Sequence, residues 1–354
     1  MADAAQSQYG IEVKGLSKIF GPDAVNLARV LDEGVTKSEL NERHGHVLGL
    51  KDISISMPAG GIQVIMGLSG SGKSTLIRHI NRLIEPTAGQ ILVGGQDVVA
   101  MSLNELREFR RHKTAMVFQK FALLPHRNVL ENTVYGLEIQ GLPRDRQVEV
   151  AMSWLERVGL KGFERSYPNQ LSGGMQQRVG LARALTNDAP ILLMDEAFSA
   201  LDPLIRVNMQ TILLELQKEI KKTVVFITHD LDEALRLGDR IAILRDGEIV
   251  QQGTGQEIVL KPADDYIMSF VRHVNRGRVV RVESIMAPPA EDPDGSAGEI
   301  SADTLLEDAA RQMIQSDAGR LTVIDDHGRA IGSVTHRSLT SAMVSGGAGD
   351  GGPA

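Results

Sequence analysis

The sequence predicts an α/β protein with a parallel central sheet. An antiparallel sheet precedes it, a helical segment is inserted into it, and a small α+β unit follows. Three runs, 62–66, 191–194 and 224–227, are almost continuously apolar, as is typical of parallel strands buried on both faces. Helical patterns over 74–84 and 203–220 alternate with these runs. Such alternation favours a parallel α/β core.

Composition limits the class of protein. The 354 residues suit one large domain and a smaller one, and 42% hydrophobic and 23% charged residues are typical of a globular chain. The chain has no cysteine, which excludes disulfides, zinc-thiolate sites and cysteine nucleophiles. No apolar run reaches the roughly 20 residues of a membrane span, and the first residues lack the pattern of a signal peptide. We expect a cytoplasmic location.

The charge is unevenly distributed. Residues 283–354 hold 12 acidic residues and 4 arginines, while the rest of the chain is nearly neutral. Neither part has the basic surface of a nucleic-acid-binding protein, so no nucleic-acid partner is expected. The stretch 272–281 contains Arg276, Arg278 and Arg281 and no acidic residue. We hypothesise that it contacts anionic lipid, which attracts surface cations; the alternative is a solvated linker.

The elements outside the central sheet follow from local pattern. Residues 11–19 and 50–57 alternate as in a half-solvated antiparallel sheet, and 21–48 between them is an inserted, partly helical segment. Residues 125–185 are mostly helical and include the only tryptophan, Trp154. This predicts a helical subdomain inserted into the α/β core.

The C-terminal part is predicted to be a separate unit. A hairpin at 245–251, with Asp246-Gly247 at its turn, and two short helices precede residue 272. The predicted domains are 1–275, a basic and then Pro/Gly-rich linker at 276–299, a compact unit at 300–344 and a flexible tail at 345–354. The compact unit is βαβ-like, with a helix at 304–315 and strands at 321–324 and 331–334.

A glycine-rich loop predicts a phosphate site. Residues 67–74 fit GxxxxGK[ST] and lie between a predicted buried strand and a helix. The loop's N–H groups and the helix N-terminus would face the phosphates. Lys73 would neutralise the β- and γ-phosphates, and the Ser74 hydroxyl would bind Mg²⁺. A tight turn without a ligand is the alternative. The predicted nucleotide-binding residues here are Gly67, Ser69, Gly70, Gly72, Lys73, Ser74 and Thr75.

Polar residues end three other predicted strands. Asp195 and Glu196 follow 191–194, Gln119 follows the strand-like 114–118, and His229 follows 224–228. Ligands bind at the carboxyl ends of strands in α/β sheets. Asp195 would hold Mg²⁺ and Glu196 would deprotonate or orient the attacking water. Gln119 and His229 would reach the γ-phosphate, and Gln119 also Mg²⁺. Alone, any of them could be structural.

A second anion site is predicted away from the loop. Ser172, Gly173 and Gly174 begin the predicted helix 176–185, where N–H groups and the helix dipole favour an anion. A serine N-cap with a turn is the alternative. Because one chain carries two half-sites, a symmetric dimer could join them head to tail and couple closure to phosphoryl transfer.

These motifs, in this order, resemble the ATP-binding cassette (ABC) family over about residues 11–272. The segments are GLSGSGKST, VFQ, LSGGM, ILLMDE, SALD and ITHD. The resemblance implies a P-loop ATPase using ATP and Mg²⁺. It also implies an adenine-stacking aromatic at Phe20, an ATP contact at Asp202, and catalytic roles for Lys73, Gln119, Glu196 and His229. Met175 and Ala197 replace the family's usual Gln and Pro.

A narrower resemblance is to the ATPase subunits of quaternary-amine importers for glycine betaine and proline betaine, carried by RLIEPTAG, MVFQKFALLPH and MDEAFSALDPLIR. It implies a homodimer on the cytoplasmic face of the inner membrane. Two permeases would dock around 121–129, and an external binding protein would deliver the substrate. Choline and proline are further candidate substrates. Alternatives are a methionine or polyamine importer, or a soluble non-transport ABC ATPase.

The C-terminal unit resembles one cystathionine-β-synthase-type (CBS) motif that opens with RVESIMAPP. The resemblance implies a small α+β fold for this unit. Relatives often carry two such motifs in tandem, and here one is visible. A short dimerisation or packing module is the alternative.

Overall fold

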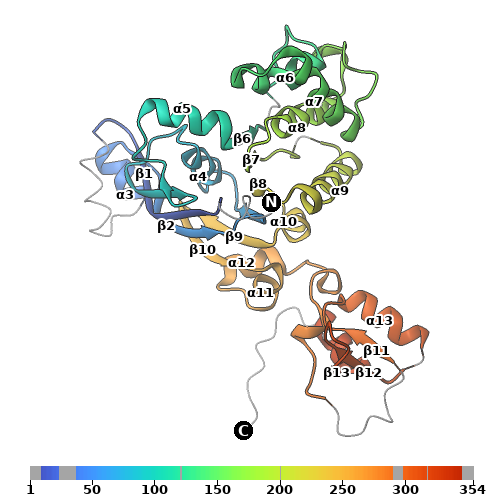
Figure 1. The fold of residues 1–354 in the computed structure, drawn as a ribbon. Helices are drawn as coiled ribbons and strands as arrows, with labels where there is room; N and C mark the ends of the chain where they lie inside the picture. Colours follow the sequence, from blue (N-terminus) through green and yellow to red (C-terminus); the bar gives the residue numbers. More distant parts are fainter. Residues whose placement is uncertain are drawn as a thin grey trace. The chain divides into compact units, whose positions relative to one another are not determined.

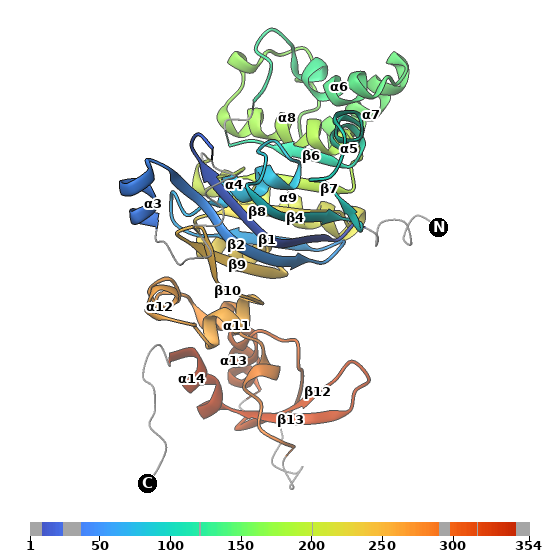
Figure 2. The same cartoon turned by 90° about the vertical axis from the view of Figure 1, so that its left-hand side faces the viewer.

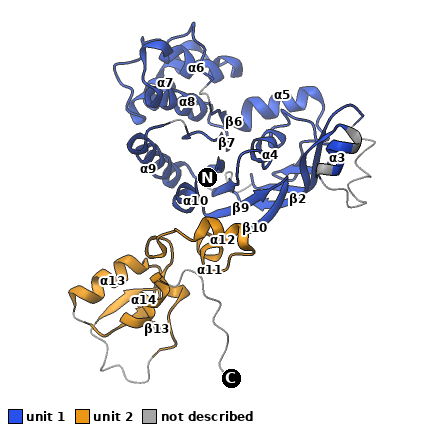
Figure 3. Ribbon diagram, turned by 180° about the vertical axis from the view of Figure 1, so that it is seen from behind, with its two compact units in different colours: residues 1–252 blue, residues 253–354 orange. Residues whose placement is uncertain are grey.

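A computed structural model describes residues 9–23, 37–119, 122–199, 201–289, 298–316 and 318–344. The chain separates into two compact units, residues 1–252 and 253–354 (Figure 3). The predicted fold class is confirmed: a parallel core, an antiparallel sheet and an inserted helical subdomain in the first unit, and a small α+β unit in the second.

The central sheet has six strands in the order β10-β9-β3-β8-β7-β6 (Figure 1). The three apolar runs are the adjacent parallel strands β3, β8 and β7, and every residue of these strands is buried. Their continuously hydrophobic sequences are therefore explained by burial of both faces of the sheet at these strands. The strand bounds are β3 Ile62–Met66, β6 Thr114–Val117, β7 Ile191–Asp195, β8 Thr223–Thr228, β9 Arg240–Arg245 and β10 Glu248–Gly253.

The second sheet is antiparallel, as predicted, with the order β2-β1-β4-β5. One apolar core contains residues of both sheets and of the helix α4 (Lys73–Ile80), for example Leu50 of β2, Ile65 of β3 and Leu76 of α4. This shared core fixes β1 and β2 beside the phosphate loop. The strands are β1 Ile11–Phe20, β2 Val47–Met57, β4 Ala88–Val93 and β5 Gln96–Asp97.

The helices of this part largely follow the prediction. α9 spans the expected residues, with Pro203 at its first position, whereas α4 ends at Ile80 rather than 84. The shorter α4 follows from Arg82, whose φ of 51° is left-handed and incompatible with continued helix. The remaining bounds are α3 Lys37–His44, α5 Leu103–His112, α9 Pro203–Ile220 and α10 Leu231–Leu237. None of the helices in the described ranges is both long and apolar enough to cross a membrane.

The predicted helical subdomain is present as one cluster of helices, visible in Figures 1 and 2. It has its own apolar core, formed by residues such as Val129, Leu155 and Val179, with Trp154 packed against it. A separate core allows this subdomain to form a distinct layer beside the sheets. The bounds are α6 Val129–Gln140, α7 Arg144–Arg157, the 3₁₀ helix η1 Pro168–Gln170 and α8 Gly173–Thr186.

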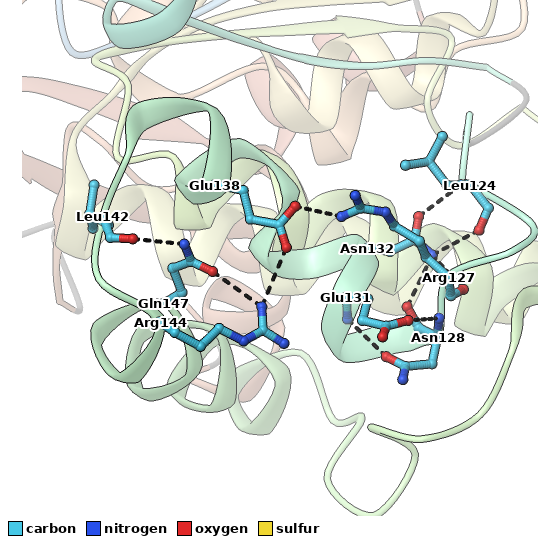
Figure 4. Close-up of polar contacts among 9 residues, drawn as sticks. All are labelled: Leu124, Arg127, Asn128, Glu131, Asn132, Glu138, Leu142, Arg144 and Gln147. Atoms are coloured by element: carbon cyan, nitrogen blue, oxygen red, sulfur yellow. Dashed lines mark hydrogen bonds and ion pairs between the residues drawn. The ribbon is translucent and has the colours of Figure 1, made fainter.

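A buried asparagine fastens the loop before α6 (Figure 4). Asn132 is fully buried, and its Nδ2 donates to the carbonyls of Leu124, Arg127 and Asn128 at 2.9–3.1 Å. Its Oδ1 accepts from the Leu124 N–H at 2.8 Å. The loop 122–128 is therefore held rigidly on α6. Phe121, which begins the predicted permease-docking segment, lies outside the described residues.

The second unit contains a three-stranded sheet in the order β11-β12-β13. β11 and β12 are parallel and joined through α13, which confirms the βαβ pattern, and β13 is antiparallel to β12. The bounds are α11 Gly255–Leu260, α12 Asp265–Val271, η2 Arg276–Arg278, η3 Val282–Ser284, β11 Glu299–Ser301, α13 Leu306–Gln315, β12 Arg320–Ile324, β13 Ala330–Thr335 and α14 His336–Val344.

The division of the chain differs from the predicted boundary at 275. The second unit begins at Gly253 and includes α11 and α12. The expected linker is partly packed structure, because Val280 and Val282 are fully buried. Gln256 Oε1 on α11 accepts from the Arg281 N–H at 2.9 Å and from the Ser284 hydroxyl at 2.7 Å. Residues 290–297 and the predicted tail at 345–354 lie outside the described residues.

The basic stretch at 272–281 has partners within its own unit. Arg278 Nε donates to Glu307 Oε2 at 2.9 Å, and Arg281 is ion-paired with Asp303. Two of the four arginines in this stretch are therefore paired with carboxylates of the same unit. The contact with anionic lipid stays a hypothesis.

Candidate functional site

The phosphate loop lies between β3 and α4, as predicted. Gly67, Gly70 and Gly72 have φ values of 155°, 79° and 105°, which side chains other than glycine rarely adopt. Space is limiting too: a Cβ at Gly67 would lie 2.3 Å from the Leu244 carbonyl oxygen, and one at Gly72 would lie 2.7 Å from that of Gly49. The glycines therefore permit a loop in which α4 begins directly at Lys73.

A cavity of about 380 Å³ opens on this loop. It collects predicted residues from β1, the loop and the ends of two sheet strands. The residues lining it are Phe20, Lys37, Val47, Leu48, Gly49, Ser69, Gly70, Gly72, Lys73, Ser74, Thr75, Gln119 and Glu196. Nine of these thirteen were predicted from sequence to bind or hydrolyse a nucleotide.

Lys73 is a buried cation. Its side chain is 4% exposed and lies 3.7 Å, Nζ to Oε1, from Glu196, and its Nζ also donates to the Leu68 carbonyl at 2.9 Å. Burial lowers the pKa of Lys73, while the nearby Glu196 and Asp195 carboxylates act in the opposite direction. Further negative charge in the cavity would favour the ammonium form of Lys73, so the site suits a polyanion.

Asp195 lies behind the loop at the end of β7 and is almost fully buried. Its Oδ1 accepts from the Ser74 hydroxyl at 2.7 Å, and its Oδ2 accepts from Arg78 Nη2 at 3.0 Å. Carboxylate, hydroxyl and amide oxygens are the ligands that Mg²⁺ prefers, and Ser74, Asp195 and Gln119 supply this set. The three predicted metal ligands therefore fit Mg²⁺ chemically.

Glu196 has an unusual backbone conformation. Its φ of 47° is left-handed, which is uncommon for a residue other than glycine and points to a functional position. Oε2 accepts from Gln119 Nε2 at 2.9 Å, and Oε1 lies 3.9 Å from Nδ1 of His229. The structure thus brings Gln119 and His229 to Glu196, which itself lies beside Lys73.

Phe20 is the last residue of β1 and also lines the cavity. Lys18 Nζ is 5.1 Å from the ring centroid, a cation–π distance. The ring packs against Gly49: a Cβ there would lie 2.6 Å from Phe20 Cε2. An aromatic ring, 39% exposed, is therefore available to stack on a planar base.

The second predicted half-site is not part of this cavity within one chain. Ser172 is the N-cap of α8, with its Oγ accepting from the Met175 N–H at 3.3 Å. Gly173 is open, and a Cβ at Gly174 would lie 2.8 Å from Ile205 Cγ2 of α9. Asp202 occupies the N-cap position of α9 without a side-chain capping bond. The nucleotide roles of Ser172, Gly173, Gly174 and Asp202 remain predictions.

Sequence reasoning missed two charged side chains of the site, Arg78 and Lys37, and the cavity-lining Val47, Leu48 and Gly49. Arg78, which bonds Asp195, lies one helical turn after Ser74, and this i, i+4 spacing is a signal that could have found it. Lys37 lines the cavity from the inserted segment, with Nζ 3.4 Å from Asp246 Oδ1. No sequence motif identifies Lys37, because its place in the cavity beside the phosphate loop is set by the tertiary fold. Ala200, within the predicted Ala200–Asp202 segment, lies outside the described residues.

Comparison with known proteins agrees with these features. The family described as ABC transporter matches residues 50–199, and the family described as CBS domain matches residues 282–345. The glycine betaine transport ATP-binding protein OpuAA of Bacillus subtilis is 56% identical over 276 residues, which cover 78% of this chain and 66% of OpuAA.

A second relative matches almost the whole chain. The glycine betaine/proline betaine transport system ATP-binding protein ProV of Escherichia coli is 48% identical over 340 residues, which cover 94% of this chain and 82% of ProV. Among solved structures, the dimeric ATP-binding cassette MJ0796 bound to ADP and Pi matches with a TM-score of 0.60 and 32% identity. That match covers 69% of this chain and 98% of MJ0796.

Proposed function

The chain belongs to the ABC transporter family as an ATP-binding subunit with a C-terminal CBS domain, and we propose that it powers import of glycine betaine, proline betaine or a related quaternary amine. The proposal that the chain hydrolyses ATP rests on the cavity in which Lys73 and Gln119 lie against Glu196. The proposal for the transported substrate rests on 48% identity to ProV across 94% of the chain.

We propose the following division of labour in ATP hydrolysis. The loop N–H groups and Lys73 bind the β- and γ-phosphates, and Lys73 exchanges its contact with Glu196 for phosphate oxygens. Glu196 then accepts a proton from the attacking water, while Gln119 and His229 hold the γ-phosphate end. Phosphoryl transfer depends mainly on such positioning and charge neutralisation.

Ser74, Asp195 and Gln119 would hold Mg²⁺. When bound, the ion supplies positive charge that neutralises the phosphate oxygens. In the described ranges, no cluster of three or more His, Cys, Asp or Glu side chains offers a metal site. A single carboxylate binds Mg²⁺ weakly, and such sites are completed by substrate phosphates and water. We therefore propose that Ser74, Asp195 and Gln119 would hold the ion together with phosphate oxygens of ATP, and that Arg78 orients the Asp195 carboxylate through its 3.0 Å hydrogen bond.

We propose that two copies of the chain complete two ATP sites. Ser172, Gly173 and Asp202 lie outside the cavity that contains Lys73, and the half-site at α8 would meet the nucleotide of a second copy. The dimeric state of MJ0796 bound to ADP and Pi supports this arrangement. Two permeases would dock on the loop 122–128, which the hydrogen bonds of Asn132 hold in a fixed conformation. This predicts peripheral attachment at the cytoplasmic face of the inner membrane.

The role proposed for Phe20, stacking on the base of ATP, can be tested separately from binding of the phosphates. Replacing Phe20 with alanine is expected to weaken ATP binding by about 1–3 kcal/mol, or roughly 5- to 150-fold, because base stacking is lost. Gly49→Ala should weaken it in the same direction, since the new Cβ displaces the ring. Titration with ATP and with inorganic tripolyphosphate measures both. Only ATP binding should change, because tripolyphosphate lacks the base.

Phe163 provides a matched control for this experiment. It is 42% exposed, compared with 39% for Phe20, and it does not line the cavity. Phe163→Ala should leave the affinity for ATP unchanged. If Phe20→Ala weakened tripolyphosphate as much as ATP, the assignment of Phe20 to the base would be wrong.

The substrate is tested by uptake of radiolabelled glycine betaine at high and low osmolarity. Cells lacking this chain are complemented with the wild type or with Glu196→Gln. We expect only the wild type to restore uptake, and unlabelled proline betaine to compete. If purified wild type hydrolyses ATP and yet does not restore uptake, the quaternary-amine assignment fails. Methionine and polyamine uptake would then decide between the alternative importers.

A further inference from the structure

Arg206 of α9 joins two loops that carry predicted catalytic residues. Its Nη2 donates to the carbonyl oxygens of Ser199 and Leu201, both at 3.3 Å. Its Nη1 lies 3.3 Å from Asp230 Oδ2, with which it forms an ion pair. Arg206 does not line the nucleotide cavity, so its partners indicate its role.

The first partner belongs to the turn that presents Glu196. The Glu196 carbonyl accepts from the Ser199 N–H at 3.2 Å and from the Ser199 hydroxyl at 3.0 Å. This closes a tight turn that starts with the left-handed φ of Glu196. Arg206 binds the carbonyl of Ser199 and that of Leu201 farther along the chain. It therefore holds the far side of the turn that fixes the Glu196 backbone.

The second partner belongs to the segment that presents His229. Asp230 uses Oδ1 to cap α10 at the Glu233 N–H, 3.1 Å away, and its own N–H donates to Thr228 Oγ1 at 3.0 Å. Its Oδ2 remains directed to Arg206. Since Asp230 directly follows His229, this contact fixes the backbone from which the His229 ring extends.

We propose that Arg206 is a positioning residue for ATP hydrolysis, because one guanidinium fixes the Glu196 turn and the His229 segment relative to each other. A planar guanidinium with several donors can bind partners on both sides at once, which an ammonium cannot do equally well. The inference rests on the proposed roles of Glu196 and His229. Small displacements of catalytic groups reduce rates strongly, so the effect belongs in kcat rather than in ATP binding.

If Arg206 only stabilised the packing of α9 against α10, its substitution would give a different result. Arg236 of α10 donates to Thr211 Oγ1 of α9 at 2.8 Å, so it ties together the same two helices away from the cavity. If Arg206 only joined α9 to α10, losing either arginine would have similar consequences. Arg236→Met is therefore the matched control.

The test measures ATP turnover by the full chain, at protein concentrations where the rate per chain no longer rises. For Arg206→Met we expect kcat to fall about tenfold, with KM for ATP changed less than twofold and Tm close to that of Arg236→Met. Arg206→Lys should recover only part of kcat. Asp230→Asn, which can still cap α10, should lower kcat as well. In the double variant Arg206→Met/Asp230→Asn, the fold decrease in kcat should be smaller than the product of the two single decreases.

Two results would overturn the inference: kcat of Arg206→Met within twofold of the wild type, or an equal loss of kcat in Arg236→Met. Wild type and Glu196→Gln are assayed in parallel. If Glu196→Gln is inactive and Arg206→Met is fully active, only the positioning role fails. If the wild type itself does not hydrolyse ATP, the proposed function fails.

Discussion

Replacing Glu196 with glutamine is expected to lower kcat for ATP hydrolysis by roughly 10²–10⁴-fold, the usual contribution of a general base. Glutamine keeps the shape of the side chain and can still accept the 2.9 Å hydrogen bond from Gln119. It cannot accept a proton from water. ATP should therefore still bind, and two-copy complexes should accumulate with ATP, as measured by size-exclusion chromatography with bound-nucleotide analysis.

The control for Glu196→Gln is Glu219→Gln. Glu219 is a 64% exposed carboxylate of α9 that is ion-paired with Arg157 away from the cavity. Its substitution should change kcat less than twofold. If Glu196→Gln retained more than about a tenth of the wild-type kcat, another group would have to accept the proton.

Replacing Lys73 with methionine is expected to weaken ATP binding about 100-fold or more. A hydrogen bond to a charged group contributes about 1.5–3 kcal/mol, and Lys73 can offer more than one such bond to the β- and γ-phosphates. Methionine fills similar space without the charge. Equilibrium titration with a fluorescent ATP analogue measures the loss directly.

Lys222 is the matched control for Lys73. Both lysine side chains are 4% exposed, but Lys222 donates to Asp188 Oδ1 and to the Ala189 carbonyl, each at 2.8 Å. Lys222→Met should lower Tm and leave the affinity for ATP unchanged. If both variants lost ATP binding equally, the loss in Lys73→Met would reflect damage to the fold.

The pKa of Lys73 adds a pH dependence to this prediction. Burial lowers the pKa of Lys73 in the protein without nucleotide, whereas bound phosphates favour the ammonium form and raise it. Binding of ATP is therefore tightest below the lowered pKa. It weakens as pH rises from that pKa to the raised one. The same titration should show this alkaline loss in the wild type and not in Lys73→Met.

The local motifs could be found from sequence because each depends on nearby residues. A glycine loop followed by Lys73 and Ser74 needs only the strand before it and the helix after it. The apolar runs at 62–66, 191–194 and 224–227 identified three adjacent buried strands, because burial on both faces demands continuous apolar sequence. Pro203 marked the start of α9 because proline suits the first helical turn.

Other features could not be predicted, because they depend on contacts between distant residues. The segment 276–284 has a basic, linker-like composition, yet Val280 and Val282 are buried and the Arg281 N–H between them donates to Gln256 Oε1. Likewise, Lys37 reaches the cavity only through the path of the inserted segment. Arg206 is the last residue of the segment MDEAFSALDPLIR, but the motif by itself assigned it no role. Its two partners, Ser199 and Asp230, follow β7 and β8 in the chain, and the pairing of these strands brings both within reach of Arg206.

The sequence by itself predicted the chemistry of this protein: which groups would bind phosphate, which would bind Mg²⁺ and which would accept a proton. Those assignments depend on residue type and on position at the end of a strand. The tertiary structure decided how the groups act together, because the order of strands in the sheet sets which ends are neighbours. It placed Glu196 against Lys73, Gln119 and His229. It also placed Arg206 between the loop that contains Ser199 and the loop that contains Asp230.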